Sequence, residues 1–344
     1  MYNTHTSIST STGPMTRRRR LPLLAATLAF GLLATACGSD SPSESVPADS
    51  ASVDSASVDS AATDDTAVEV ADTAPVPAAG EIGAAVFNQE IADLLPADIR
   101  DSGVLTLATD PTDPPLEFYD ESNEIVGAEV DLAAALGVVL GIEVELVPSK
   151  FDAIIPGVEA GRFDGALSGF ADRVERQELV DFVDFYTTSR GYLIKTGSVP
   201  ELADASELCG YVVAVAKGTT MADAIGGLSD TCVEEGKDAI DGQIFPDQAA
   251  GVLAVQSGRA DLTILSGHAS LAIAQNSGGE LDVVLRPNEG TDINGILLRK
   301  GDLTEAVQPA IQQLMDDGTL LAIMTTWNLQ DLVLSEATVN AGVN

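Results

Sequence analysis

Two stretches of this chain repeat one short pattern, and the repeat limits the folds that the chain can adopt. Residues 160–169 read AGRFDGALSG, and residues 257–267 read SGRADLTILSG. In each, a glycine follows a helix-like segment and supplies a left-handed C-cap, an apolar run predicts a buried strand, and Ser-Gly favours a sharp turn. The pattern is therefore half of an α/β unit that occurs twice, and it predicts two lobes.

The segments around both repeats alternate between strand and helix patterns. Strands are predicted at 104–109, 142–147, 163–167, 211–215, 261–265, 282–285 and 295–298. Helices are predicted at 127–140, 152–160, 247–256 and 303–315, with an amphipathic segment at 320–329. Right-handed crossovers between such strands predict mostly parallel sheets. Because open α/β sheets bind ligands at the carboxyl ends of their strands, two such corners predict a cleft.

The charge and motifs of the chain exclude several classes of function. The 344 residues suffice for about two domains, and a formal net charge of −36 argues against a nucleic-acid partner. His5 and His268 form no cluster with metal-ligand spacing, so no metal is expected, and His268 is expected to be a surface or corner residue without function. No phosphate loop or nucleophile elbow is present, and no cofactor is expected.

The N-terminal 80 residues are expected to be an export signal and a tether. Arg17 to Arg20 precede the apolar run 21–36, which is short for a membrane span and suits a signal peptide. The small residues before Cys37 resemble a bacterial lipobox, in which the thiol is acylated, as by palmitate, and becomes the mature N-terminus. An ordinary signal with an incidental cysteine is the alternative, and the export route and a start at Met15 stay open. Residues 37–80 are acidic without aromatics, which predicts disorder.

The two remaining cysteines, Cys209 and Cys232, are expected to form a disulfide. A cysteine pair in an exported protein is more often bridged than free.

Two candidate anion-binding elements follow the two sets of strands. Arg176 stands a short loop beyond the first repeat, where its guanidinium can grip a carboxylate through two hydrogen bonds or pair with a neighbouring glutamate. The run KGTT at 217–220 follows a strand and opens a helix, so its amides and hydroxyls suit an anion or only cap the helix. Together they predict one small carboxylate held between two lobes.

These stretches together resemble the extracellular solute-binding proteins of ABC importers, of the polar amino acid type known as bacterial family 3. The resemblance covers roughly residues 96–329. The matching stretches are 110–118, 127–132, 151–156, 161–164, 168–169, 175–176, 180–182, 217–220, 256–261, 317–319 and Trp327. The resemblance implies a type II periplasmic-binding-protein fold, in which two α/β lobes joined by a two-stranded hinge close around a ligand that a permease then receives.

The resemblance also implies roles for individual residues. Arg176 and Thr220 would hold the α-carboxylate of the ligand, Phe151 would stack on its side chain, and Asp110 would reach its side chain or amine. Ser168 and Gly169 would contact it through backbone or hydroxyl groups. The predicted ligand-binding residues are Asp110, Asp113, Phe151, Ser168, Gly169, Phe170, Arg176, Thr219, Thr220 and Ser266.

Three departures from the family pattern concern ligand specificity. Asp113 and Leu116 stand where an aromatic residue is usual, and Ala171 replaces a hydroxyl residue. Ser266 stands where an aspartate is expected to meet the amine of the ligand. Because a buried ammonium without a countercharge is costly, either Asp110 or Asp113 supplies the charge, or the ligand has no α-amine.

The sequence therefore predicts a monomeric, lipid-anchored binding protein on the outer face of the cell membrane, which delivers an amino acid or related carboxylate to an ABC permease. The expected division is signal 1–36, tether 37–80, first lobe 81–190 with 288–334, second lobe 191–287 and tail 335–344. No enzyme activity is expected. The alternatives are a dehydratase or cell-wall lyase of the same fold, with Asp110, Asp113 or Asp172 as acid or base, and a ligand sensor without transport.

Overall fold

The computed structural model describes residues 85–198, 205–286 and 291–343. The predicted signal and tether, with Cys37, lie outside the described residues. Among the described helices, none is long and apolar enough to cross a membrane.

The first sheet has six strands in the order β14-β7-β13-β6-β1-β5. They are β1 (Val104–Thr109), β5 (Glu143–Pro148), β6 (Gly165–Ala166), β7 (Val180–Thr188), β13 (Asp292–Arg299) and β14 (Val333–Val339). β1 runs parallel to β5 and β6, whereas the pairs β13·β6, β13·β7 and β14·β7 are antiparallel. The prediction of a mostly parallel sheet is therefore wrong for this sheet, because three of its five strand pairs are antiparallel.

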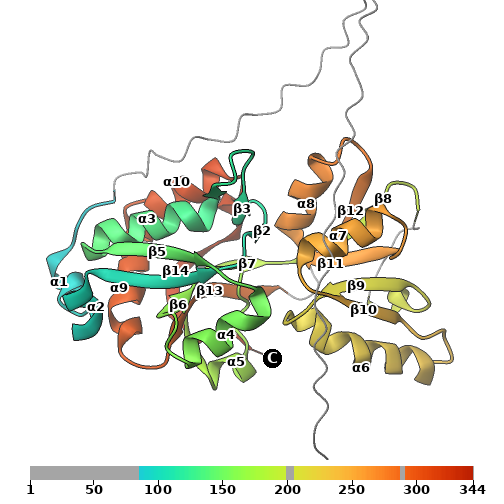
Figure 1. Cartoon of the computed structure of the whole chain (residues 1–344), viewed down its shortest axis with the longest axis horizontal. Helices are drawn as coiled ribbons and strands as arrows, with labels where there is room; N and C mark the ends of the chain where they lie inside the picture. Colours follow the sequence, from blue (N-terminus) through green and yellow to red (C-terminus); the bar gives the residue numbers. More distant parts are fainter. Residues whose placement is uncertain (1–84, 199–204, 287–290, 344) are drawn as a thin grey trace, which may run out of the picture. The chain divides into compact units, whose positions relative to one another are not determined.

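Helices from both ends of the described chain cover this sheet. α3 (Ala128–Leu140), α9 (Leu303–Asp316) and α10 (Thr319–Thr326) share one apolar core, and Figure 1 shows the red C-terminal helices beside the green α3. Gly127 and Gly141 bound α3, and a Cβ on Gly127 would lie 2.1 Å from the carbonyl oxygen of Leu116. Trp327 closes this core while its Nε1 donates to Asp131 Oδ2 at 2.8 Å.

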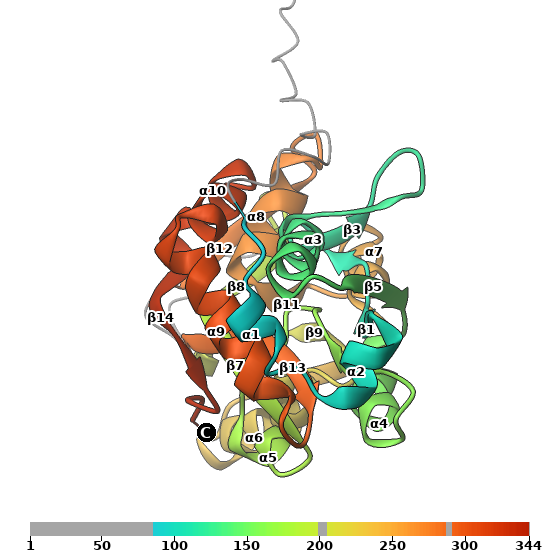
Figure 2. The same cartoon turned by 90° about the vertical axis from the view of Figure 1, so that its left-hand side faces the viewer.

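Smaller elements complete the first lobe. A three-stranded sheet holds β2 (Thr112–Asp113), β3 (Glu117–Tyr119) and β4 (Ile125–Val126). The remaining helices are α1 (Gln89–Ala92), α2 (Ala97–Ser102), α4 (Phe151–Glu159) and α5 (Val174–Gln177). Figure 2 shows α1 next to α9, a neighbourhood that the hydrogen bond from Asn88 Nδ2 to Gln313 Oε1 at 2.7 Å also indicates.

The second sheet has five strands in the order β10-β9-β11-β8-β12. They are β8 (Arg190–Lys195), β9 (Val212–Ala216), β10 (Asp241–Phe245), β11 (Leu262–Ser266) and β12 (Leu281–Arg286). The associated helices are α6 (Thr220–Glu234), α7 (Gln248–Gln256) and α8 (Gly267–Gln275), with a short 3₁₀ helix at Ala205–Leu208 and a second, Gln330–Leu332, before β14. The Cys209–Cys232 disulfide, with a Cα–Cα distance of 5.6 Å, ties the segment before β9 to α6.

The repeated sequence pattern has the same structure in both lobes. β6 and β11 each lie parallel to the leading strand of their sheet, β1 and β9. In both copies the aspartate accepts from a backbone N–H of that leading strand, since Thr106 N donates to Asp164 Oδ2 at 3.0 Å and Val212 N donates to Asp261 Oδ2 at 2.8 Å. The inference of two lobes from this repeat is confirmed by the two sheets.

The chain passes from the first sheet to the second at Ser189 and returns between Arg286 and Asp292. β7 pairs with β13 up to Thr188 opposite Asp292, and β8 pairs with β12 from Arg190 opposite Arg286. We therefore keep 191–287 as our proposal for the second lobe and extend the first lobe, predicted as 81–190 with 288–334, to residue 339, because β14 belongs to the first sheet.

The predicted tail 335–344 is wrong in its first part, because β14 occupies 333–339 and pairs with β7. Two buried aspartates hold the segment that follows. Asp184 Oδ2 accepts from Ala341 N at 3.1 Å and from Thr338 Oγ1 at 3.3 Å, and Asp172 Oδ2 accepts from Gly342 N at 2.7 Å. Burial, together with the Asp172 carboxylate, raises the pKa of Asp184 to about 7.

This raised pKa predicts a pH-dependent contribution to stability. The folded protein retains a proton on Asp184 that the unfolded chain releases above the ordinary value of 3.8, so the free energy of unfolding falls as pH rises through about 7. The side chain in Asp184→Asn stays neutral at both pH values. Between pH 5 and pH 8, the free energy of unfolding of this variant should therefore fall by at least about 1 kcal/mol less than that of the parent. Urea unfolding at both pH values measures this difference, and equal losses would contradict it.

Candidate functional site

A cavity of about 100 Å³ lies where the strand ends of both sheets meet, and it brings together most of the predicted ligand-binding residues. The predicted residues among its lining are Asp113, Phe151, Ser168, Gly169, Arg176, Thr219, Thr220 and Ser266.

Arg176 lies on α5, just after the first corner, and bridges the two lobes. Its Nη1 donates to Ala171 O at 2.9 Å, and its Nη2 donates to Gly218 O of the second lobe at 3.2 Å. Burial lowers the pKa of Arg176 from its ordinary value, yet an arginine keeps its charge in proteins. Because a guanidinium has five N–H groups, this side chain retains donors for an anion in the cavity.

Two stacked phenylalanines lie beneath this guanidinium. The rings of Phe151 and Phe170 are 4.3 Å apart at an interplanar angle of 12°, and the Arg176 guanidinium carbon lies 5.3 Å from the Phe170 centroid. Phe170 is 1 % exposed and is not among the residues that line the cavity. The structure therefore assigns Phe170 a supporting position under Phe151 and Arg176, instead of the predicted place in the cavity wall.

The KGTT run begins α6. Thr219 is its N-cap, since Thr219 Oγ1 accepts from Ala222 N at 3.2 Å and donates to Ala216 O at 2.7 Å. The Thr219 hydroxyl therefore caps the helix, which was the alternative to anion binding that the sequence left open for this run. Thr220 also lines the cavity, and its hydroxyl makes no hydrogen bond to another described residue.

The polar groups of the Ser168–Gly169 corner form hydrogen bonds with other residues of the first lobe. Ser168 Oγ accepts from Asp110 N at 2.8 Å and donates to Glu117 Oε1 at 3.1 Å. Gly169 N donates to Glu129 Oε2 at 3.2 Å, and Gly169 O accepts from Asn294 Nδ2 at 3.2 Å. The predicted ligand contacts through these polar groups are therefore largely taken up by the protein itself.

Asp113 lies in the cavity opposite the second corner. It is 5 % exposed, and Ser266 Oγ donates to its Oδ1 at 3.3 Å. His268 Nε2 lies 2.9 Å from Ser266 Oγ and 3.7 Å from Asp113 Oδ2, and His268 Nδ1 lies 3.3 Å from Thr188 Oγ1. The first lobe thus places a carboxylate next to the serine that replaces the expected aspartate.

Asp110, the other candidate countercharge, points elsewhere. Its Oδ2 accepts from Phe151 N at 2.9 Å, and it lines a smaller space of about 10 Å³ beside the main cavity. Burial raises the pKa of Asp110, and the hydrogen bond from Phe151 N opposes that rise. Five residues line both spaces: Phe151, Ser168, Ala216, Thr219 and Gln248.

Sequence reasoning missed several residues of the site. His268 is 8 % exposed and lies at the second corner beside Ser266, so of the two predicted positions the corner is correct and the surface is wrong, while its lack of function stays a prediction. The only available signal was its position two residues after Ser266. Asn294 and Asp292 reach the cavity on β13, and no local pattern marks them. Asn294 Oδ1 and Gln248 Oε1 are buried acceptors without a hydrogen-bond partner in the described part of the chain.

Two ion pairs join the lobes at the edge of the site. Lys150 Nζ lies 3.2 Å from Asp247 Oδ2, and Lys217 Nζ lies 2.7 Å from Asp152 Oδ2. Both lysines are about two-thirds exposed, at 64 % and 65 %, so each pair contributes little to stability.

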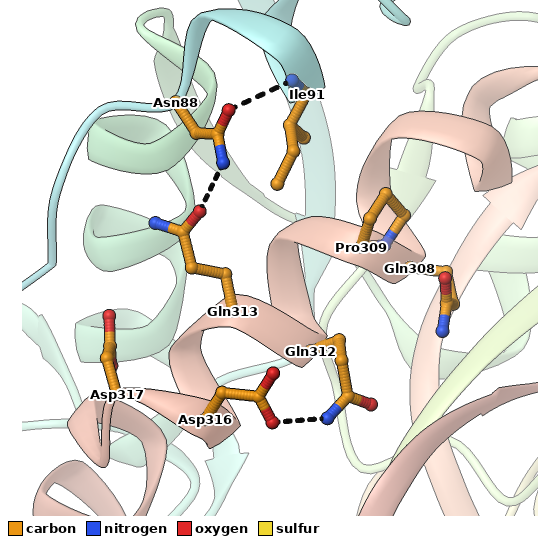
Figure 3. A pocket seen from close by; sticks show the side chains of 8 residues that line it. All are labelled: Asn88, Ile91, Gln308, Pro309, Gln312, Gln313, Asp316 and Asp317. Atoms are coloured by element: carbon orange, nitrogen blue, oxygen red, sulfur yellow. Dashed lines mark hydrogen bonds between the residues drawn. The ribbon is translucent and has the colours of Figure 1, made fainter.

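A larger and more open hollow, of about 480 Å³, lies between α1 and α9. Figure 3 shows that its polar side chains point largely toward one another, and Gln312 Nε2 donates to Asp316 Oδ1 at 2.8 Å. It contains none of the predicted site residues, so we place the candidate site in the smaller cavity. Within the described ranges, no group of three or more His, Cys, Asp or Glu side chains is arranged to hold a metal ion.

Comparison with known proteins adds a family match, a named relative and two similar solved structures. A family model described as bacterial extracellular solute-binding proteins, family 3, matches residues 105–330. The arginine-binding protein ArgT of Corynebacterium glutamicum is 33 % identical over 253 residues, which are 73 % of this chain and 83 % of ArgT.

Two solved structures have the same fold. An ancestral arginine-binding protein bound to arginine has a TM-score of 0.60 at 29 % identity, covering 65 % of this chain and 98 % of that one. An ancestral amino acid-binding protein described as a precursor of cyclohexadienyl dehydratase has a TM-score of 0.56 at 29 % identity, covering 67 % and 97 %.

The position of Gly169 leads to a prediction about the corner. Its φ is +57°, and a Cβ there would lie 2.7 Å from Asp113 Oδ2, whereas Gly161 has a φ of +69° with nothing within 4 Å. Both Gly→Ala variants should lose about 1 kcal/mol from the left-handed conformation. Only Gly169→Ala should also displace Asp113 and weaken ligand binding, by about tenfold or more. Thermal unfolding and calorimetry measure the two effects, and equal ligand affinities in both variants would contradict this role of Gly169.

Proposed function

This chain belongs to the family 3 bacterial extracellular solute-binding proteins, which serve amino acid ABC importers, and we propose that its ligand is a cationic amino acid bound in the cavity between the two lobes. The family is extracellular by its description, and binding of a solute is its role.

One observation carries the proposed ligand class: Arg176 and Asp113 line the same small cavity with opposite charges. The guanidinium suits the α-carboxylate, with Thr220 beside it, because arginine pairs with carboxylates through two parallel hydrogen bonds. Asp113, in contact with Ser266, supplies the charge that the α-ammonium needs. Of the two countercharges that the sequence left open, the geometry favours Asp113 over Asp110.

The smaller adjoining space supports a second positive charge on the ligand. Asp110, Glu117 and Asp247 line it, together with the unpartnered Oε1 of Gln248. This space is no larger than one water needs, so a ligand side chain that points past Phe151 reaches these oxygens only at the entrance of the space, where they favour a guanidinium or ammonium group. ArgT and the ancestral relative, both named for arginine, make L-arginine the first probe.

Binding without turnover is the proposed activity. The dehydratase precursor among the similar structures keeps an enzyme of this fold as the second candidate, since Asp113 and His268 would be available for proton transfer. Recovery of unchanged ligand after incubation with the protein supports binding alone, and a new product would favour the enzyme.

Closure of the lobes around the ligand is the proposed signal to a permease. Two hydrogen bonds link the lobes within the site, one from Arg176 to Gly218 and one from Ser266 to Asp113. A ligand that contacts both lobes therefore favours the closed form. A monomer suffices for this mechanism.

Removal of the Arg176 side chain should abolish tight binding. Arg176→Ala leaves the ligand carboxylate without its charged partner, which costs about 2–5 kcal/mol, or at least about thirtyfold in Kd. Arg162→Ala is the control, because Arg162 also lies over a ring, 5.6 Å from the Phe163 centroid, and does not line the cavity. Calorimetry with L-arginine, after a thermal-shift screen of amino acids and organic acids, measures both variants. Parent-like affinity in Arg176→Ala would show that the site is misassigned, and stabilisation by amine-free acids alone would contradict the amino acid ligand.

We also propose that residues 1–36 are removed and that a lipid on Cys37 anchors the protein to the membrane through the tether 37–80. The sequence around Cys37 supports this proposal. Cys37→Ser should eliminate labelling by a palmitate analogue and move the protein from the membrane fraction to the medium, while the Cys209–Cys232 bridge stays intact. Membrane retention of the unlabelled variant would contradict a lipid anchor.

A further inference from the structure

A pair of buried glutamates lies directly behind the first corner. Glu117 and Glu129 are each 1 % exposed. Ser168 Oγ donates to Glu117 Oε1 at 3.1 Å, Gly169 N donates to Glu129 Oε2 at 3.2 Å, and Tyr186 OH donates to Glu129 Oε1 at 3.3 Å. The proposed ligand binding uses Glu117 only as one of the residues that line the smaller space, and it does not use the charge of Glu129.

The contact between these two side chains requires a proton. The two carboxyl groups lie close enough for each to affect the pKa of the other, and two ionised carboxylates offer only acceptors to each other. In the described part of the chain, no N–H or hydroxyl group reaches Glu117 Oε2, so a proton of the pair is the donor available to it. Burial raises the pKa of Glu129 to about 7 and, with the Glu129 and Asp113 charges, raises the pKa of Glu117 well above 4.5.

Asp113 connects the pair to the cavity. It lies on the other side of Gly169, where a Cβ would be 2.7 Å from its Oδ2, and its charge acts on both glutamates. From the second lobe, Ser266 and His268 face Asp113.

Among the residues that the structure describes, no basic side chain forms a hydrogen bond or an ion pair with Glu117 or Glu129. The polar groups around it are the Tyr186 hydroxyl, which donates to Glu129, and the Asn294 amide, which lies 3.5 Å from that hydroxyl. Burial and the Glu129, Glu117 and Asp113 charges raise the pKa of Tyr186 well above 10, so this hydroxyl stays neutral. Proton binding therefore reduces the negative charge of Glu117 and Glu129, which no cationic side chain neutralises in the described part of the chain.

We propose that Glu117 and Glu129 hold more than one proton between them in the ligand-free protein at neutral pH, and that Glu129 releases a fraction of a proton to solvent when the ammonium group of the ligand binds Asp113, while one proton stays in their contact. The proposal rests on the proposed function, because it needs a cationic group at Asp113. The arriving charge offsets the repulsion that Asp113 exerts on Glu129, so Glu129 ionises and then attracts the ligand. Glu117 and Glu129 thus act on specificity through Asp113, as positioning residues that favour cations.

Proton release can be measured directly on the full chain. Calorimetry with L-arginine at pH 7, in phosphate and in Tris, should give enthalpies that differ by the ionisation of about half a proton per ligand, because the pair titrates near pH 7. The Kd should fall about threefold per pH unit around pH 7, since binding that releases protons strengthens as pH rises. If L-arginine binds clearly and the binding enthalpies are equal in both buffers, no proton is released and the proposal is wrong. Absence of any binding heat would contradict the proposed ligand and, with it, this proposal.

Isosteric variants identify the source of the proton. Glu129→Gln keeps a hydrogen-bonding side chain of the same size and should remove the buffer dependence while the protein stays folded. Glu117→Gln can still donate a hydrogen bond to Glu129 and should retain the buffer dependence. Asp184→Asn is the matched control, because Asp184 is also buried with a pKa of about 7 but does not line the cavity, and it should leave the release unchanged. Release that persists in Glu129→Gln would place the proton on another group and overturn the proposal.

Discussion

The ligand site depends on the left-handed turn at Gly169, where three separate elements meet one residue that has no side chain. Glu129 from α3 accepts its N–H, Asn294 from β13 donates to its carbonyl, and Asp113 from β2 occupies the space that a Cβ would take. A buried backbone group without such partners is costly, so the corner keeps its shape only while these side chains stay in place. The same contacts position Asp113 in the cavity, which makes the geometry of the turn and the charge of the site inseparable.

The two corners carry one sequence pattern but have different chemistry. Gly169 leads through a turn to Arg176, whereas Ser266 caps α8 by accepting from Ala269 N at 3.3 Å and uses its hydroxyl proton for Asp113. A serine in this place cannot neutralise an ammonium. In the proposed complex the charge comes instead from Asp113 of the opposite lobe, to which the Ser266 hydroxyl donates. A carboxylate on the first lobe, Asp113, thus takes the place of the aspartate that the family pattern has at the position of Ser266.

Local patterns predicted the regular elements well where burial follows a helical period. The helices over 127–140 and 303–315 correspond to α3 and α9, and both end at residues that the sequence marks. β7 and β14 were missed because their partners are strands far away in the sequence and because β7 carries aspartates that read as loop or surface. Asp184 on β7 is fully buried and bonded to the C-terminal segment, and only the folded chain brings these groups together.

By itself, the sequence determined the α/β class, the two lobes and the arginine beside the first corner, because helix caps, apolar runs and Gly-x-Asp spacing act within a few residues. Tertiary structure decided which side chains face the ligand. Phe170 and Asp110 lie next to strand ends as predicted. However, the Phe170 ring stacks on Phe151, and the Asp110 carboxylate accepts a hydrogen bond from the Phe151 backbone N–H. The roles of Asp113, His268 and the Glu117–Glu129 pair depend on contacts across 50 or more residues or on close packing at Gly169. Electrostatic interactions depend on distance and burial in the folded chain, and neither quantity is encoded in local spacing.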